Sequence, residues 1–436
     1  MICGIDLGTT YSLIGHGENL YSDLVASAVD LKTKQQIDLD LINPNVIHSY
    51  KTDMTTGEMG ELPISCSSIV LKKLADIASK RVGETVTDVV ISVPAKFTTT
   101  QREATWRAAQ LAGLNPRGLI NEPTAAAIYA CKDYKDLIVV YDLGGGTFDV
   151  TILDARTGQY YVVATDGNGK LAGDNLDMAI ADYIMKESHV PIMKKSKVNL
   201  LELYKKCRHA KENITRYADS QFIEFQDMGI AFTLTRDKYI ELMKMTFQPT
   251  IDLTLNVIRN SLMEFDKPKL LFVGGSTADG FLREWVKDEL GLEEFNIDCN
   301  PSFIVARGVS LYAEMVEDGR ADIEINDVTD RLSIELASGI TETIIEKNSV
   351  IPTSETHLIC NDEDTRYINL NLYQGDGVMA VQNSYIGTLV YDYGQVMTKG
   401  TGVVDVEVRV DRNGHVTLLA TDLTRNETQE IKLIMR

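Results

Sequence analysis

The sequence predicts an α/β domain followed by an all-β module of antiparallel strands. Three observations lead to this prediction. Compact β-branched runs alternate with helical patterns up to about residue 320, the apolar period changes to two beyond that point, and one strand-and-turn pattern occurs twice in the first part. We therefore expect two structural classes in one chain of 436 residues, with a boundary within residues 318–330.

The clearest early strand is residues 89–93. Their sequence, Val-Val-Ile-Ser-Val, is a compact β-branched run that predicts a buried strand, and it ends at Pro94, because a central strand does not tolerate proline. A helix should follow from about Thr98, where threonines can cap the first turn, and it should stop at Gly113 and Pro116.

A second set of elements lies beyond residue 135. Residues 137–141, Leu-Ile-Val-Val-Tyr, predict another buried strand, and residues 270–273 predict a short one. Residues 174–217 and 237–265 have helical patterns. Strands that alternate with helices indicate an α/β domain.

Beyond the boundary the apolar period is mostly two, as expected for half-buried strands. Residues 367–372 and 404–410 alternate, and residues 411–414, Asp-Arg-Asn-Gly, lead into a further run at 415–418. An Asn-Gly turn between alternating runs is a hairpin signal. Residues 331–436 are therefore expected to form a separate antiparallel β domain.

Composition limits the classes of partner and compartment. The formal net charge of −20 argues against nucleic acid or an anionic membrane, because phosphate contacts need clustered Lys and Arg. The six cysteines are scattered without a C-x-x-C pair, so we expect neither a zinc site nor a disulfide scaffold but a reducing compartment. Met1 leads directly into the first strand pattern and no apolar run approaches the ~18 residues of a membrane span, which predicts a cytoplasmic protein without a signal peptide.

The pattern that occurs twice lies at residues 2–10 and 139–147. Each copy is a strand followed by Asp-Leu-Gly, small residues and threonine. Glycine lets backbone N–H groups approach an anion closely, and an aspartate at a strand end can hold Mg²⁺ through water. Two such turns predict two homologous lobes that clamp one polyphosphate. Ordinary tight turns are the alternative, and it is weaker for two copies than for one.

Five motifs in order and spacing resemble those of the seventy-kilodalton heat-shock family, the DnaK-type chaperones. The resemblance extends over nearly the whole chain, because residues 372–375 and 411–414 in the β module are also similar to that family's peptide-binding domain. The five motifs lie at residues 4–10, 89–95, 121–127, 141–149 and 272–277.

The resemblance implies an α/β actin-like ATPase domain with a duplicated ribonuclease H-like fold, followed by an all-β antiparallel sandwich. The implied parts are residues 1–320, with lobes at about 1–135 and 136–320, a linker at 321–330, and a peptide-binding sandwich at 331–436. The implied function is an ATP-dependent chaperone that slowly hydrolyses ATP to ADP and phosphate and couples this to binding and release of extended apolar segments of unfolded proteins. ATP or ADP, Mg²⁺ and K⁺ are the implied cofactors. A J-domain co-chaperone and a nucleotide exchange factor are implied partners.

The resemblance also assigns catalytic roles to Lys51, Glu122, Thr147 and Asp149. Lys51 would neutralise charge on the transferred phosphoryl group, while Glu122 and Asp149 would orient or deprotonate the attacking water. These roles agree with phosphoryl transfer in general, which depends mostly on positioning and electrostatic stabilisation. Taken alone, Lys51 is more typical of a surface lysine, Glu122 of a charge at a helix N-terminus, and Asp149 of a turn carboxylate.

The remaining nucleotide-site roles concern Mg²⁺ and direct contacts. Asp6 and Asp142 would hold Mg²⁺ through water. The residues expected to contact the nucleotide are Gly8, Thr9, Thr10, Tyr11, Gly144, Gly145, Gly146, Thr147, Gly173, Asp174, Lys211, Thr215, Gly274, Gly275 and Ser276.

The adenine side departs from the family pattern at three positions. Arg208 stands where glutamate is usual, Glu212 stands where arginine is common, and Ala278 replaces a usual arginine. The family often sandwiches adenine between two arginine stems, a stacking contact. Loss of this contact costs ~1–2 kcal/mol, or roughly tenfold in affinity, so we expect weaker nucleotide binding and not its absence.

In the β module the resemblance implies a cleft for an extended peptide with one apolar anchor. The same alternating residues could equally form the module's own core. Pro94 and Arg102 match positions that relay coupling between the domains, with a strand terminator and a surface charge as the plain alternatives. The expected cleft residues are Leu336, Ala337, Leu358, Ile359, Cys360, Asn361, Ile368 and Leu370.

Two further departures bear on that coupling. The linker is acidic and offers only Ile323, Ile325 and Val328 as apolar residues, so its docking should be weaker. The chain ends soon after the last β pattern, so we expect no helical lid and a faster release of bound peptide.

Three other functions remain open from the sequence. They are a filament-forming or scaffold protein of the actin superfamily, a small-molecule kinase of that superfamily, and a nucleotide sensor that binds but barely hydrolyses. The β module argues against the filament, and the Asn-Glu-Pro-Thr and Gly-Gly-Gly-Thr-Phe-Asp strings favour the chaperone over the kinase.

Overall fold

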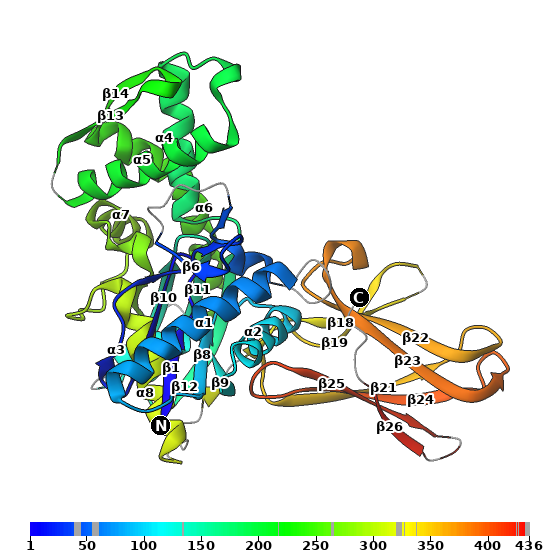
Figure 1. Ribbon diagram of the computed structural model, residues 1–436. Coiled ribbons are helices and arrows are strands. Elements are labelled where there is room, and N and C mark those ends of the chain that lie inside the picture. Colours follow the sequence, from blue (N-terminus) through cyan, green and yellow to red (C-terminus); the bar gives the residue numbers. More distant parts are fainter. Residues whose placement is uncertain are drawn as a thin grey trace. The chain divides into compact units, whose positions relative to one another are not determined.

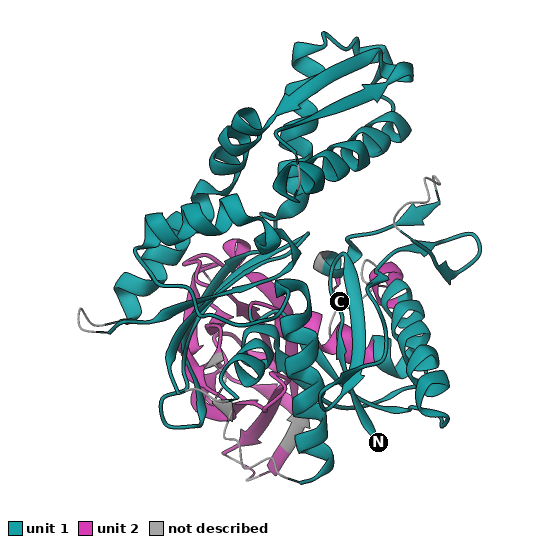
Figure 2. Ribbon diagram, turned by 90° about the vertical axis from the view of Figure 1, so that its left-hand side faces the viewer, with its two compact units in different colours: residues 1–53, 65–95, 108–324 teal, residues 54–64, 96–107, 325–436 magenta. Residues whose placement is uncertain are grey.

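The computed structural model describes residues 1–38, 45–54, 61–132, 135–216, 218–262, 266–319, 325–326, 328–336, 338–423, 425 and 427–431. The chain forms two compact units (Figure 2). The first, the nucleotide unit, contains residues 1–53, 65–95 and 108–324. The second, the β unit, contains residues 54–64, 96–107 and 325–436.

The first sheet of the nucleotide unit is mixed. Its strand order is β3-β2-β1-β8-β9, and β4 pairs with β2. Strand β1 runs antiparallel to β2 and parallel to β8, which runs parallel to β9. The elements of this part of the chain are β1 (Ile2–Asp6), β2 (Tyr11–His16), β3 (Asn19–Leu20), β4 (Val25–Ala26), β5 (Val29–Asp30), β6 (Gln35–Gln36), β7 (Val46–Ile47), η1 (Tyr50–Asp53), α1 (Glu61–Val82), β8 (Asp88–Val93), α2 (Thr99–Leu111), β9 (Asn115–Asn121) and α3 (Glu122–Ala130).

Strand β9 was not expected from the sequence, because Pro116 and Gly118 interrupt its apolar residues. The structure explains why both are tolerated. The strand lies at the edge of the sheet, where a residue without an N–H group can sit on the unpaired side. Strand β8 and helix α2 lie where the sequence predicted them.

The second sheet contains β15, β10, β11 and β12 in that order. Its central strand β10 (Leu137–Leu143) is buried along all 7 residues, as expected for a strand covered on both faces. The strand runs antiparallel to β11 and parallel to β15. The remaining elements here are β11 (Phe148–Asp154), β12 (Tyr160–Asn168), α4 (Gly173–Glu187), η3 (Ile192–Lys194), α5 (Lys197–Arg216), β13 (Ser220–Phe225), η4 (Gln226–Met228), β14 (Ile230–Thr235), α6 (Arg236–Ser261), β15 (Lys269–Val273), η5 (Gly275–Ala278), α7 (Gly280–Leu290) and α8 (Pro301–Glu317).

The predicted helix at 174–217 is wrong as one element, because the structure divides it into α4 and α5. The break contains His189, whose φ is 49°, followed by Pro191. A left-handed residue and a proline both end a helix. Figure 1 shows α4 and α5 together with the hairpin β13–β14, at the upper end in that view.

Helix α8 packs very closely on α3 and on β1. A Cβ atom on Gly308 would lie 1.7 Å from the carbonyl oxygen of Ala125, and one on Gly4 would lie 2.3 Å from that of Val309. Only glycine permits backbones to approach this closely. Helix α8 has a stabilised N-terminus, because the Asn300 side chain accepts a hydrogen bond from Ser302 N–H and Pro301 occupies the first helical position.

The β unit contains two four-stranded antiparallel sheets, in the orders β19-β18-β22-β23 and β21-β24-β25-β26. Residues from both sheets, such as Leu372 on β22 and Val406 on β24, belong to one hydrophobic core. The elements are β16 (Ile325–Asn326), β17 (Val328–Thr329), β18 (Leu332–Glu335), β19 (Thr341–Ile345), β20 (Ser349–Val350), β21 (Thr353–Cys360), β22 (Thr365–Gln374), η6 (Ala380–Gln382), β23 (Ser384–Met397), β24 (Val403–Val410), β25 (Val416–Asp422) and β26 (Glu427–Ile431).

The coarse expectation, an α/β part with mixed sheets followed by antiparallel β structure, agrees with these sheets. The hairpin predicted at residues 404–418 is present as β24 and β25. Within the described ranges of the chain, none of the helices combines the length and apolar character that a bilayer span requires.

Candidate functional site

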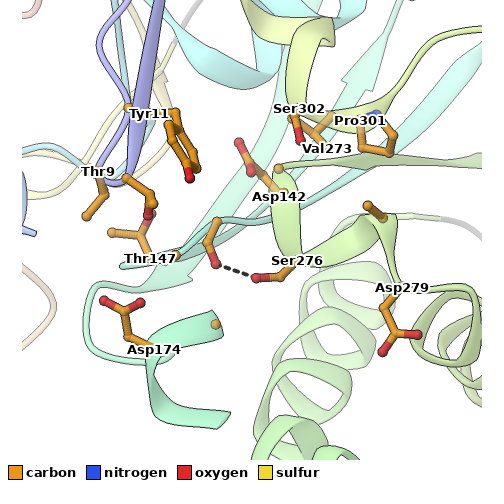
Figure 3. Close-up of a pocket in the computed structure, with 18 of the residues that line it drawn as sticks. Thr9, Tyr11, Asp142, Thr147, Asp174, Val273, Ser276, Asp279, Pro301 and Ser302 are labelled. Atoms are coloured by element: carbon orange, nitrogen blue, oxygen red, sulfur yellow. Dashed lines mark hydrogen bonds between the residues drawn. The ribbon is translucent and has the colours of Figure 1, made fainter. Parts of the chain in front are cut away.

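The nucleotide unit contains a cavity of about 430 Å³ to which both glycine turns contribute. Figure 3 shows Thr9 and Tyr11 on one side of this cavity and Asp142 and Ser276 on the other. Most of the expected site residues line it. They are Asp6, Gly8, Thr9, Thr10, Tyr11, Lys51, Glu122, Asp142, Gly144, Gly145, Thr147, Gly173, Asp174, Lys211, Thr215, Gly274, Gly275 and Ser276.

Two of the expected residues do not line the cavity. Asp149 is buried on β11 directly opposite Asp142, and repulsion from it contributes to the raised pKa of Asp142. Gly146 packs against Thr9, and a Cβ atom on it would lie 2.4 Å from the Thr9 Cγ2 atom. Gly146 therefore lets the two turns approach each other.

The two turns are held by their own backbone and by small side chains. Gly8 N–H donates to the Ser12 hydroxyl at 3.1 Å, and Gly144 N–H donates to the Thr147 carbonyl at 3.0 Å. A Cβ atom on Gly145 would lie 2.1 Å from Thr10 Oγ1. That hydroxyl is buried without a hydrogen-bond partner among the described residues. An unsatisfied buried hydroxyl between two glycine turns fits an anionic ligand that would accept a hydrogen bond from it.

Carboxylates gather at the inner end of the cavity around one lysine. Lys51 is only 3% exposed, and its Nζ lies 2.6 Å from Oε1 of Glu122, the first residue of α3. Burial, with added repulsion from Glu122, raises the pKa of Asp6 to about 7, although Lys51 opposes this shift. Burial and repulsion from Glu122, Asp149 and Asp6 hold the pKa of Asp142 well above its usual range. This excess of acidic groups over a single buried cation fits a divalent metal ion.

The start of helix α4 is attached to the second turn. Gly173 N–H donates to Gly144 O at 3.0 Å, and Asp174 N–H donates to Gly145 O at 2.9 Å. The Ser276 hydroxyl also donates to Gly144 O, at 2.8 Å. The helix start, the turn and η5 therefore form one wall of the cavity.

Arg208 enters this wall from α5. Its guanidinium donates to Asp174 at 2.6 Å and to Asp177 at 3.0 Å, and Lys211 pairs with Asp177 at 2.6 Å. Asp174 accepts a further hydrogen bond from the Ser49 hydroxyl, at 3.0 Å. The N–H groups of Arg208 are thus committed to the carboxylates of Asp174 and Asp177.

Sequence reasoning missed several residues of the cavity. Asp177 had no signal beyond its place on a helix. Ser49, which does not line the cavity but binds the lining residue Asp174, lies in a loop. Asp279, which accepts from the Tyr239 hydroxyl at 2.5 Å and caps α7, could have been found as a cap before an apolar helix. The additional lining residues include Leu24, Leu176, Asp177, Arg216, Tyr239, Phe247, Val273, Asp279, Pro301, Ser302 and Val305. The three residues noted as departures, Arg208, Glu212 and Ala278, also line the cavity.

The structure divides the expected peptide-binding residues. Leu336, Leu358 and Cys360 are exposed, and Leu358 is 68% exposed. Ile368 is buried in the hydrophobic core of the β unit, and the partly buried Ile359 and Leu370 pack against that core. Ala337 lies outside the described residues.

Asn361 has a structural place next to these residues. Its amide nitrogen donates to the carbonyls of Glu363, Met397 and Thr398, and its oxygen accepts from Gly402 N–H at 2.8 Å. Asn361 therefore ties together two loops at the end of β21.

The two residues expected in coupling lie in different units. Pro94 is buried directly after β8 in the nucleotide unit. Arg102 lies in the β unit, where it is buried and donates to the carbonyl of Asn413 at 3.4 Å and to that of Phe97 at 3.3 Å. Within the same unit, Thr99 N–H donates to Gln374 Oε1 at 2.9 Å. Of the linker, residues 321–324 and 327 lie outside the described residues.

Comparison with known proteins extends over nearly the whole chain. The model of a family described as Hsp70 protein matches residues 40–435. The chain is similar to the chaperone protein DnaK of Mycoplasma mycoides subsp. mycoides SC, with 33% identity over 473 aligned positions that cover 99% of this chain and 79% of that protein.

Proposed function

This chain belongs to the Hsp70 family and is an ATP-dependent molecular chaperone with ATPase activity, and from that premise we propose which of its residues bind and hydrolyse ATP. The observation that carries the proposal is the cavity to which the two glycine turns, a buried lysine and a set of carboxylates all contribute. The family as a whole binds ATP or ADP with Mg²⁺. No comparison and no feature of the described residues favours the filament or small-molecule kinase alternatives.

The proposed fold is the family's. Each sheet of the nucleotide unit has a central strand, β1 or β10, with an antiparallel partner on one side and a parallel partner on the other. This shared plan supports a duplicated actin-like domain at residues 1–320, with lobes at about 1–135 and 136–320. A linker at 321–330 and a β-sandwich at 331–436 complete the proposed organisation.

The phosphates are proposed to lie between the two turns. The turns at 8–11 and 144–147 would supply backbone N–H groups, and the unsatisfied Thr10 hydroxyl would donate to a phosphate oxygen. Gly173, Gly274 and Gly275, with the Ser276 side chain, keep the neighbouring backbone close to the same space.

Asp6 and Asp142 would hold Mg²⁺ through water, jointly with the nucleotide. No group of three or more His, Cys, Asp or Glu side chains in the described part of the chain converges to hold a metal ion by itself. When bound, Mg²⁺ supplies positive charge to the phosphate oxygens. The raised pKa of each carboxyl supports the assignment, because both groups lie in a position where a cation would favour their charged forms.

Lys51, Glu122, Thr147 and Asp149 are the proposed catalytic residues. Lys51 would stabilise charge on the transferred phosphoryl group, and its ion pair with Glu122 fixes its ammonium in the cavity. Glu122 would orient the attacking water and accept its proton, while Asp149 would act through Asp142. Positioning and charge stabilisation are the main contributions that a protein makes to phosphoryl transfer.

The nucleoside side is proposed to bind weakly. Lys211 and Thr215 line the cavity on the proposed ribose side. Lys211 pairs with Asp177, Arg208 is held by Asp174 and Asp177, and Ala278 offers only a methyl group. This supports the expected loss of about tenfold in affinity that a missing stacked pair brings.

Single-turnover hydrolysis tests these assignments. The intact chain, Thr147→Ala and Lys51→Ala would be mixed with a small excess of protein over Mg-ATP, and both variants should hydrolyse at least ~100-fold more slowly. Equal rates in all three proteins would remove the catalytic assignment. Measurable binding of ATP with hardly any hydrolysis by the intact chain would favour a nucleotide sensor.

We propose that an extended apolar segment of an unfolded protein binds near Leu336, Leu358 and Cys360, the exposed members of the expected set. Arg102 and Pro94 would relay the nucleotide state to this surface, and a J-domain co-chaperone and a nucleotide exchange factor would act on the cycle. Release of a labelled apolar heptapeptide, followed with and without ATP, tests the coupling. Release rates that do not respond to ATP would contradict it.

A further inference from the structure

The segment between α4 and α5 presents two large apolar side chains to solvent at the same point. Ile192 is 86% exposed and Met193 is 90% exposed, and they follow Pro191 in a single turn of helix. A scattered exposed apolar residue needs no explanation, but two adjacent ones at a tip are unusual for a surface that only faces water.

Three lysines directly follow the tip in the sequence. Lys195 and Lys197 are exposed on its C-terminal side, with Lys194 partly exposed beside them. Residues 186–206 contain six lysines and two glutamates, whereas the whole chain has a net charge of −20. The overall charge led us to expect no anionic membrane partner, but this local distribution has the opposite sign.

The tip is held in shape by the residues around it. The Asn199 side chain donates to the Lys194 carbonyl at 2.8 Å, and Lys195 N–H donates to the Ile192 carbonyl at 2.9 Å. On either side, Val190 and Leu203 are buried in the hydrophobic core of the nucleotide unit. The two apolar side chains are therefore presented by an ordered base, so that little conformational entropy would be lost on docking.

We propose that this tip, residues 191–198, docks on an anionic lipid surface. Ile192 and Met193 would enter the boundary between headgroups and acyl chains, while Lys195 and Lys197 face the lipid phosphates. Apolar insertion combined with nearby lysines is the combination that binds peripheral proteins to acidic bilayers. An acidic protein surface would match the lysines but would not require two protruding apolar side chains.

The acidic remainder of the protein does not prevent this docking. The Debye length is ~8 Å at physiological ionic strength, so charges farther from the lipid surface than this are largely screened. Each lysine near an acidic bilayer contributes about fivefold in affinity, and the lysines of the tip act together.

Vesicle sedimentation of the full chain tests the proposal. The vesicles are phosphatidylcholine alone, or equal parts of phosphatidylcholine and phosphatidylserine. We expect binding to the mixed vesicles only, a loss of ~10-fold or more in Ile192→Ser/Met193→Ser, and a loss of at least about 25-fold in Lys195→Glu/Lys197→Glu.

Matched controls change the same kinds of residue elsewhere. Met245→Ser removes a methionine that is 70% exposed on α6, and Lys32→Glu/Lys34→Glu changes the net charge by the same amount at an exposed turn. Both should bind as the unaltered chain does, and all variants should keep its basal ATP hydrolysis, because none of these residues lines the cavity.

Three results would overturn the proposal. They are equal binding to both kinds of vesicle, unchanged binding by the two tip variants, and displacement by polyglutamate together with unchanged binding of Ile192→Ser/Met193→Ser. The last result would identify an acidic polypeptide as the partner. An excess of apolar heptapeptide should not compete, since the tip is not part of the peptide-binding surface.

Discussion

Replacing Lys51 by methionine should separate the stability of the buried ion pair from its role in catalysis. The Lys51 ammonium lies 2.6 Å from Glu122 Oε1, and the two side chains are 4% and 12% exposed. Removal of one partner from a buried pair leaves the other charge uncompensated and typically costs ~3–5 kcal/mol. Methionine has a similar length and no charge, so little of this loss should come from packing.

The second substitution of the cycle is Glu122→Gln. The double variant also removes the Glu122 charge that lost its partner, so it should regain most of the stability lost in Lys51→Met. It should not regain the rate of hydrolysis, because the proposed charge on the phosphoryl group is still missing, at a cost of ~10²–10³ in rate.

Two measurements report on the two effects. Urea unfolding of the protein without nucleotide or metal gives stability, and single-turnover hydrolysis of Mg-ATP gives the rate. Lys72→Met is the control, since Lys72 forms an exposed pair with Asp76 on α1 and should lose no more than ~0.5 kcal/mol. The reasoning is refuted if Lys51→Met unfolds at the same urea concentration as the unaltered chain and hydrolyses ATP equally fast.

Three further outcomes are expected. Burial raises the pKa of Asp6 to about 7, so the folded protein without metal keeps a proton that the unfolded chain releases near pH ~4. The free energy of unfolding should therefore fall as pH rises through 7. Thermal unfolding measured from acid to neutral pH checks this, and Asp6→Asn should flatten the dependence on pH. Gly308→Ala should destabilise the protein by ~1–3 kcal/mol although alanine has the better helix propensity, because the added Cβ would lie 1.7 Å from a carbonyl oxygen. Gly280 has open space around it, so Gly280→Ala should be neutral or stabilising in urea unfolding. Arg208→Ala should lower the free energy of unfolding by ~1–3 kcal/mol, because Asp174 loses its guanidinium partner. The same change should speed the release of labelled ADP in stopped flow, and an unchanged release rate would contradict this.

The sequence predicted the structure best where the pattern within a single element was enough to define that element. Residues 137–141 are apolar without interruption, and the structure buries the whole of β10. The repeated Asp-Leu-Gly turn predicted two halves that meet around a polyphosphate, and the cavity is lined from both turns. Glycine spacing carries this information because close backbone approach excludes every other residue.

Prediction was weaker where the deciding contact is tertiary. Strand β9 tolerates Pro116 only because it lies at a sheet edge, and edge position cannot be deduced from the residues themselves. The break between α4 and α5 did have a local signal in Pro191, which periodicity outweighed. Asp177 lines the cavity and Ser49 binds the lining residue Asp174 only through the packing of distant elements, so no local pattern marks them.

In the β unit, alternation alone did not show which apolar residues face the core. Ile368 and Leu358 were both expected in the peptide cleft, and only the structure distinguishes them: the first is buried and the second is 68% exposed. Period-two patterns define two faces of a strand, but the neighbouring sheet decides which face is covered.

The exposed thiol of Cys360 gives the unaltered chain its own attachment point for a fluorescent reporter. Burial raises the pKa of the four thiols that lie inside the protein and leaves them slow to react with maleimides, while Cys299 is partly covered. A dye on Cys360 would stand at the end of β21, next to Leu358, and its emission would register an arriving peptide without any engineered cysteine. The buried four are Cys3, Cys66, Cys131 and Cys207.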